Sequence, residues 1–183
     1  DSIQGGNGND SILGGKGNDT IYGENGADTI FGGQNNDILF GGDQNDRISG
    51  DDGFDSIAGG NGNDTLFGGN GNDTVQGEEG NDSVDAGHNS DVVSGGDGND
   101  TLFGNHGADY IEAGDGADVL RGGEGADYLR GYGRSAAFDD GNYFEAGDND
   151  DSLFGGDAMD TMFGELGNDL VYGNAGNDLI YGN

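Results

Sequence analysis

The chain has 183 residues, of which 44 are glycine, and it contains no proline, cysteine or tryptophan. The absence of cysteine excludes disulfides and thiolate metal sites, and no apolar run is long enough to span a membrane. Five basic residues against 37 acidic ones give a net charge of −32, which excludes the clustered Lys and Arg that nucleic-acid partners require.

A nine-residue unit organises the chain: Gly-Gly-x-Gly-x-Asp-x-U-x, where U is a large aliphatic residue. It runs in one register from Gly5 to Arg130 and again from Ala146 to Tyr181. The segment GGKGNDTIY at residues 14–22 is a typical unit. Repetition at a short fixed period predicts a solenoid, in which each unit contacts mainly its neighbours.

Each unit predicts a turn followed by a short strand. Positions one to six carry the glycine and Asn/Asp residues that turns with positive φ require. Positions seven to nine alternate β-branched and apolar residues, as in a three-residue strand. Because so short a strand is not stable alone, we expect it to stack in parallel on the strand of the next coil, with two units per coil. The prediction is an all-β solenoid, a parallel β-roll of about ten coils, on the order of 50 Å long.

The eighth position of every unit is apolar and supplies one inward side chain per unit to the predicted core. Its members are Ile12, Ile21, Ile30, Leu39, Ile48, Ile57, Leu66, Val75, Val84, Val93, Leu102, Ile111, Leu120, Leu129, Phe144, Leu153, Met162, Val171 and Ile180. One buried side chain per nine residues is a small core. Ordering the backbone costs about 1 to 2 kcal/mol per residue, and glycine loses the most freedom, so burial of this core alone does not offset the cost of folding.

The sixth position of the unit is aspartate, so stacking unit n on unit n+2 brings like charges to within about 5 Å. Carboxylates and turn carbonyls are hard oxygen ligands, which favour calcium over magnesium, and zinc would require more His or Cys than this chain has. We therefore expect a chain that is disordered without calcium and folds by binding about 14 to 16 ions. The predicted metal ligands are Asp10, Asp19, Asp28, Asp37, Asp46, Asp55, Asp64, Asp73, Asp82, Asp91, Asp100, Asp109, Asp118, Asp127, Asp151, Asp160, Asp169 and Asp178.

These units resemble the glycine- and aspartate-rich nonapeptides of the RTX (repeats-in-toxin) family, and the resemblance covers essentially the whole chain. It implies a right-handed parallel β-roll with calcium held between turns by the sixth-position carboxylates and by neighbouring backbone carbonyls. It also implies a bacterial protein secreted by type I export to the extracellular medium or the cell surface. The family includes toxins, proteases, lipases and surface proteins, so the repeat does not define an activity.

The repeat is interrupted at residues 131–145, which divides the chain into a first block, 1–130, and a second block, 146–183, of the same solenoid. The interruption equals one unit plus about six residues, and Asn142 stands where an aspartate is expected. The extra residues, 134–139, are predicted to bulge from an edge. A docking loop is one interpretation, and an insertion tolerated at a turn is the favoured one.

Substitutions at the fourth position identify weaker turns. Asn tolerates the left-handed conformation, whereas Gln44 and Ala158 adopt it at a greater cost, so the calcium sites beside them are the least secure.

His88 and His106 occupy the third position of units n and n+2, so they are expected to stack on one edge. A metal or pH-sensing pair is conceivable, but solvated surface histidines are the more common case. No catalytic constellation is present, and we expect no enzyme activity.

The outward ninth position is aromatic near both ends of the chain and mostly polar between them. Contiguous exposed aromatic stripes are typical of contact surfaces, and they also suit exposed strands through β-propensity alone. The candidates for contacts with flanking domains or other copies of the chain are Phe31, Phe40, Phe154, Phe163, Tyr172 and Tyr181.

Two functions are consistent with these features. The first is a calcium-dependent folding, secretion or scaffold module of a larger protein, which we expect because the chain begins and ends within a repeat. The alternative is a structural protein whose uncapped, aromatic-rich terminal coils stack end to end into a filament or surface layer.

Overall fold

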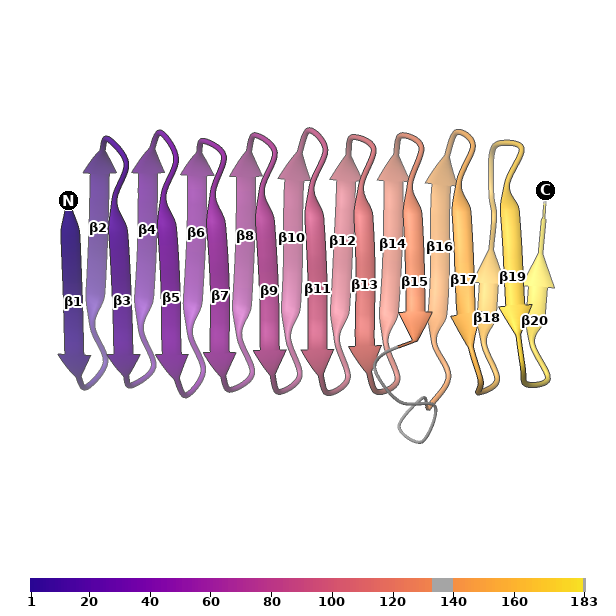
Figure 1. Ribbon diagram of the computed structural model, residues 1–183, viewed down its shortest axis with the longest axis horizontal. Helices are drawn as coiled ribbons and strands as arrows, with labels where there is room; N and C mark the ends of the chain where they lie inside the picture. Colours follow the sequence, from indigo (N-terminus) through magenta and orange to yellow (C-terminus); the bar gives the residue numbers. More distant parts are fainter. Residues whose placement is uncertain (133–139, 183) are drawn as a thin grey trace.

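Strands alternate along the chain between two parallel sheets, which face each other across the core (Figure 1). The computed structural model describes residues 1–132 and 140–182. The extra residues 134–139, which we expect to bulge, lie outside these ranges. The described part of the chain has no helix long and apolar enough to cross a membrane.

The first sheet contains the odd-numbered strands: β1 (Ser2–Asn7), β3 (Thr20–Asn25), β5 (Ile38–Asp43), β7 (Ser56–Asn61), β9 (Thr74–Glu79), β11 (Val92–Asp97), β13 (Tyr110–Asp115), β15 (Tyr128–Tyr132), β17 (Ser152–Gly156) and β19 (Leu170–Asn174). The second contains the even-numbered strands: β2 (Ser11–Lys16), β4 (Thr29–Gln34), β6 (Arg47–Asp52), β8 (Thr65–Asn70), β10 (Ser83–His88), β12 (Thr101–His106), β14 (Val119–Glu124), β16 (Tyr143–Asp148), β18 (Thr161–Phe163) and β20 (Leu179–Tyr181).

The coils confirm the predicted stacking of unit n on unit n+2. Ile12 of β2 pairs with Ile30 of β4, and Leu66 of β8 pairs with Val84 of β10, so equivalent repeat positions are always neighbours. In Figure 1 the odd strands descend in front and the even strands rise behind while the chain advances, which is a right-handed coil. The two described ends of the chain lie at opposite ends of the rod (Figure 1).

The strands are longer than the sequence pattern predicts. Most have six residues and run from the seventh position of one unit to the third position of the next, as in Ser56–Asn61, so the prediction of three-residue strands was wrong. The glycine-rich start of each unit continues the ladder because its second residue has positive φ in coil after coil: Gly42, Gly60 and Glu78 have φ of 117°, 112° and 83° and are neighbours in one sheet. Equal distortions stacked in register keep the parallel hydrogen bonds intact.

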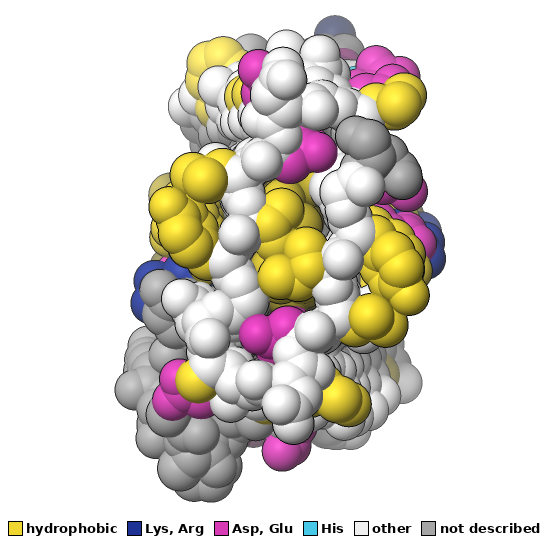
Figure 2. Space-filling view, turned by 90° about the vertical axis from the view of Figure 1, so that its right-hand side faces the viewer, with side chains coloured by type: hydrophobic (Ala, Val, Ile, Leu, Met, Phe, Trp, Pro, Cys, Tyr) yellow, Lys and Arg dark blue, Asp and Glu magenta, His cyan; other side chains and the backbone are white. Residues whose placement is uncertain are grey.

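The apolar core occupies the space between the sheets. The eighth-position side chains from Ile21 to Met162 are fully buried. Figure 2, which looks onto the C-terminal end of the rod, shows hydrophobic side chains between the two sheets with acidic side chains above and below them. In the last coils Val171 is partly buried and Ile180 is 46% exposed, so the core thins there. The prediction of an eighth-position core therefore holds except for Ile180.

The fourth-position turns differ at the two predicted weak points. Gln44 adopts φ of 77°, as expected for a residue that replaces a left-handed glycine. Ala158 is not among the described residues with positive φ, so the expected strain is absent there.

The solenoid continues across the interruption in the same register. Val119 and Leu120 of β14 pair with Tyr143 and Phe144 of β16. The hydrogen bonds from the backbone N–H of Asp118 to the side chain of Asn142 and from that of Asp127 to Asp151 span 24 residues, whereas equivalent bonds away from the interruption span 18. The described residues on either side of the extra segment therefore resume the parent coil.

Two adjacent valines in β11 test how much the core contributes to the free energy of unfolding. Val93 is fully buried whereas Val92 is 46% exposed, and both are in the same strand. In calcium, Val93→Ala is expected to lower the free energy of unfolding by about 2 kcal/mol, because it removes buried apolar surface and leaves a cavity. The control Val92→Ala should change it by less than about 0.5 kcal/mol. Urea titration followed by circular dichroism measures both, and equal effects would contradict the assignment of the inner face.

Candidate metal centres

The sixth-position aspartates form two rows, one along each edge of the rod, where the chain passes from one sheet to the other. From Asp19 to Asp160 these carboxylates are at most 3% exposed. One row contains Asp1, Asp19, Asp37, Asp55, Asp73, Asp91, Asp109, Asp127, Asp151 and Asp169. The other contains Asp10, Asp28, Asp46, Asp64, Asp82, Asp100, Asp118, Asn142, Asp160 and Asp178.

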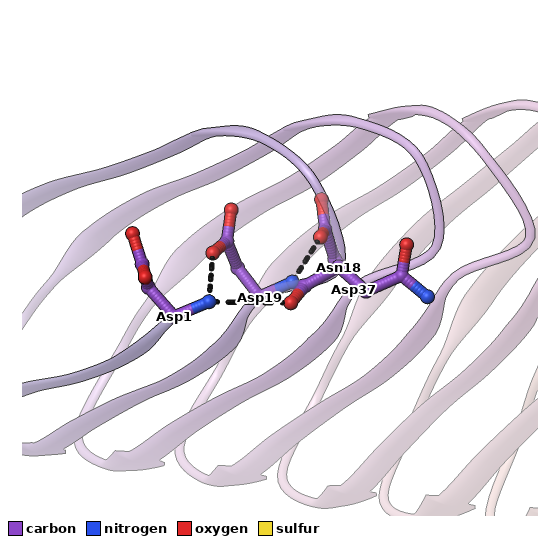
Figure 3. Close-up of polar contacts among 4 residues, drawn as sticks. All are labelled: Asp1, Asn18, Asp19 and Asp37. Atoms are coloured by element: carbon purple, nitrogen blue, oxygen red, sulfur yellow. Dashed lines mark hydrogen bonds and ion pairs between the residues drawn. The ribbon is translucent and has the colours of Figure 1, made fainter.

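One oxygen of each carboxylate is fixed by the preceding coil. The backbone N–H of Asp19 donates to Oδ1 of Asp37 at 2.7 Å, and the N–H of Asp64 donates to Oδ1 of Asp82 at 2.8 Å. The amino group of Asp1 makes the same contact with Asp19 at 2.7 Å (Figure 3). This ladder holds the carboxylates from Asp19 and Asp28 onward in one orientation, which leaves the second oxygen of most of them buried.

The second carboxylate oxygen, Oδ2, is buried without a hydrogen-bond donor throughout most of both rows. Burying an acceptor without a donor is unfavourable, and the penalty is larger for a charged one. The residues concerned are Asp10, Asp19, Asp28, Asp37, Asp46, Asp55, Asp64, Asp73, Asp82, Asp91, Asp100, Asp109, Asp127 and Asp151. Two parallel arrays of unsatisfied oxygens are therefore built into the fold.

In most of these units the first position is glycine, which lies close beside the buried oxygen; in the units of Asp91 and Asp151 it is the buried Ala86 and Ala146. A Cβ added to Gly5 would lie 2.8 Å from Oδ2 of Asp10 and 2.9 Å from the carbonyl oxygen of Gly23 in the next coil. At Gly14 the corresponding distances, to Oδ2 of Asp19 and the carbonyl oxygen of Gly32, are 2.8 and 2.6 Å. Each glycine thus lies beside a small space that is bordered by a carboxylate oxygen and a carbonyl oxygen of successive coils.

Burial raises the pKa of many row aspartates in the middle coils, from Asp37 to Asp109, and of Asp127 and Asp151. Desolvation is the main cause, and the neighbouring carboxylates of the same row add to it, while the backbone N–H bond opposes it. The pKa rises to about 8 for Asp91, to about 7 for Asp46, Asp55, Asp82, Asp100 and Asp127, and to about 6 for Asp151. A buried row of this kind requires either protons or a cation to neutralise it.

The donor set fits calcium. It consists of carboxylate and carbonyl oxygens, which calcium accepts in flexible geometry, and it contains no sulfur or imidazole. Within residues 1–132 and 140–182, no three His, Cys, Asp or Glu side chains converge on one point. The acidic groups are arranged in rows rather than clusters, so an ion between two coils would take its remaining ligands from backbone carbonyls.

The turns reinforce the rows through a second ladder on the outside. At the fifth position, Oδ1 of Asn81 accepts from the backbone N–H of Asn99 at 2.7 Å, and Oδ1 of Asn63 accepts from that of Asn81 at 2.8 Å. This explains why Asn is frequent beside the sixth-position Asp: its amide oxygen bridges successive turns and keeps the carboxylates in line.

The two histidines stack as predicted. The rings of His88 and His106 are parallel with centroids 4.7 Å apart, and Nδ1 of His106 lies 3.1 Å from Oε2 of Glu124. All three side chains are exposed at the third position of their units.

The ninth-position aromatic rings form ladders on the outer faces. Tyr22 stacks on Phe40 at 5.0 Å, Phe154 on Tyr172 at 5.3 Å, and Phe163 on Tyr181 at 4.8 Å between centroids. Seventh-position Tyr110 and Tyr128 extend the ladder of Phe154 along the first sheet. Phe31, the remaining predicted contact residue, is only partly exposed in β4.

A family model, the RTX calcium-binding nonapeptide repeat, matches the chain in overlapping copies over residues 4–133 and 137–183. The chain belongs to the RTX family. No curated protein gives a significant match. The RTX β-roll is a structural calcium-binding fold, which agrees with the buried, outwardly inaccessible carboxylates described above.

Sequence reasoning predicted the aspartate rows and turn carbonyls as metal ligands, and it left two features of the rows open. One is which carbonyl lies beside each carboxylate: in the structure it is that of the first-position residue of the next coil, as Gly23 shows beside Asp10. The other is the unequal role of the two carboxylate oxygens, which depends on the alignment of one coil with the next.

Proposed function

We propose that this RTX chain folds by binding calcium between successive coils along both edges of the rod. The ligands are the eighteen sixth-position aspartates predicted from the sequence, from Asp10 to Asp178, with first-position carbonyls such as that of Gly23. The observation that carries the proposal is the array of buried Oδ2 atoms without donors. About 14 to 16 ions would satisfy it, one for each pair of stacked aspartates.

Charge makes calcium a condition of folding rather than an addition to a stable fold. The net charge is −32, and much of it lies in the two rows of stacked carboxylates. Repulsion between neighbouring carboxylates and the loss of their hydration both oppose folding. The basic side chains Arg121 and Arg130 pair instead with Glu145 and Glu112 on the outer faces. A divalent ion in each gap would convert the repulsion into attraction between coils.

This behaviour suits a secreted protein. Calcium is scarce in the bacterial cytosol and abundant outside, so a chain that folds on calcium stays extended for type I export and folds after it. We infer that the chain serves as such a folding and scaffold module of a larger extracellular or cell-surface protein, and that it is not an enzyme.

Calcium titration of the wild-type chain and two variants tests the proposal. In excess chelator the β signal in circular dichroism should be lost, and calcium should restore it cooperatively. Asp82→Asn removes a buried row carboxylate and should reduce the calcium bound per chain, measured by equilibrium dialysis, by about one or two ions. The control Asp85→Asn, on the exposed outer face of β10, should leave it unchanged. A β signal that persists in chelator, or equal effects of the two substitutions, would refute the proposal.

The aromatic ladders favour a second candidate, association with other copies of the chain. Tyr172 and Tyr181 are 49% and 45% exposed, and each ends a ladder of stacked rings on its sheet. If the ladders are contact surfaces, sedimentation in millimolar calcium should show oligomers that Tyr172→Ser and Tyr181→Ser together abolish. A monomer at all concentrations would eliminate this candidate and leave the module function.

A further inference from the structure

Asn142 is the one residue other than aspartate at the sixth position of the repeat. It nevertheless keeps its place in the row. Its side chain is buried, its Oδ1 accepts from the backbone N–H of Asp118 at 2.9 Å, and its own N–H donates to Oδ1 of Asp160 at 2.8 Å. The hydrogen-bonded ladder therefore passes through Asn142 without a gap.

The second polar atom of the Asn142 side chain, Nδ2, is a hydrogen-bond donor at a place where the other units of the row have an acceptor. In the typical units, the atom beside the first-position glycine is a carboxylate Oδ2, as Asp10 shows at Gly5. At Gly131 it is Nδ2 of Asn142, which lies 2.6 Å from the Cβ position. An amide –NH₂ carries two donors and no acceptor, so it cannot ligate a cation. It donates instead to the carbonyl oxygen of Gly131 at 3.1 Å.

The next carboxylate in the same row is also satisfied by the protein. Oδ2 of Asp160 accepts from the backbone N–H of Gly156 at 2.8 Å, whereas Oδ2 of Asp82 and its equivalents have no donor. Around Asn142, protein donors thus take the place that a cation is proposed to fill elsewhere.

The outer face of these coils carries its own cross-links. Arg121 of β14 pairs with Glu145 of β16 at 2.6 Å, and the hydroxyl of Tyr143 donates to the same carboxylate at 2.7 Å. The ion pair joins the coil before the interruption to the coil after it, and the Tyr143 hydroxyl, in the same strand as Glu145, holds that carboxylate in place. The opposite row has no such substitution: the N–H of Asp127 donates to Oδ1 of Asp151 at 2.7 Å, and both Oδ2 atoms lack donors.

We propose that Asn142 forms a calcium-free junction, at which one of the two calcium rows is divided while the other continues. The inference rests on the proposed function, because it concerns where calcium is left out. The amide substitutes for the ion at the coil that also accommodates the extra residues. The row from Asp10 to Asp118 is thereby separated from the pair formed by Asp160 and Asp178.

Calcium counting on matched variants tests the junction. Asn142→Ala removes the amide and should leave the calcium bound per chain unchanged, although it should lower the thermal stability of the calcium-loaded chain, because the carbonyl of Gly131 loses its donor. Asn142→Asp supplies the missing carboxylate and should add about one or two ions, in the gaps toward Asp118 and Asp160. Equilibrium dialysis at saturating calcium gives the count, and circular dichroism verifies folding of each variant.

The outcomes separate this inference from the proposed function. A loss of ions in Asn142→Ala would mean that Asn142 holds calcium, and it would overturn the junction. A folded Asn142→Asp chain with an unchanged count would do the same. If Asn142→Asp does not fold, the alanine variant alone decides. Asp82→Asn is the reference: if it also leaves the count unchanged, the proposed function fails, whereas a loss there with no gain in Asn142→Asp rejects only the junction.

Discussion

The fold depends on two rows of carboxylates that are buried with one oxygen satisfied and the other without a donor. The backbone N–H of the preceding coil holds Oδ1, which fixes the direction of Oδ2 as in Asp64 and Asp82. The first-position glycine provides space beside it, and the carbonyl of the following coil borders the same space. The backbone geometry, the glycine content and the acidic charge thus all contribute to one set of buried acceptors, which protons or a cation must neutralise.

This constraint explains why so little of the chain is free to vary. A side chain at the first position would collide with the aspartate of its own unit, as at Gly14 and Asp19, although the alanines Ala86, Ala113 and Ala146 are accommodated and buried. The second position must adopt positive φ, and the eighth must fill a core one side chain wide. Variation is therefore confined to the outer faces and to the turn edges, where the aromatic ladders and the histidine pair lie.

The sequence was sufficient to predict the architecture because the repeat imposes the same environment on every unit. The register of Ile12 on Ile30, the buried column and the alignment of the aspartates all follow from a nine-residue period with two units per coil. Strand length could not be predicted, because a glycine with positive φ normally indicates a turn. In the solenoid the paired residues Gly60 and Glu78 both have positive φ, so the hydrogen bonds between their strands continue through these positions. The donor from Asn142 to Gly131 depends on atomic positions at an irregular coil, where the period gives no guidance.

The central claim is that calcium lies inside the rod, between the Oδ2 atoms of the rows and the first-position carbonyls. Diffraction from crystals grown in calcium, with anomalous differences to locate the ions, tests it most directly. The account predicts anomalous peaks along both edges, each between successive coils and within about 2.3 to 2.6 Å of an aspartate Oδ2. Peaks confined to the outer surface, with the Oδ2 atoms still buried and uncoordinated, would contradict it.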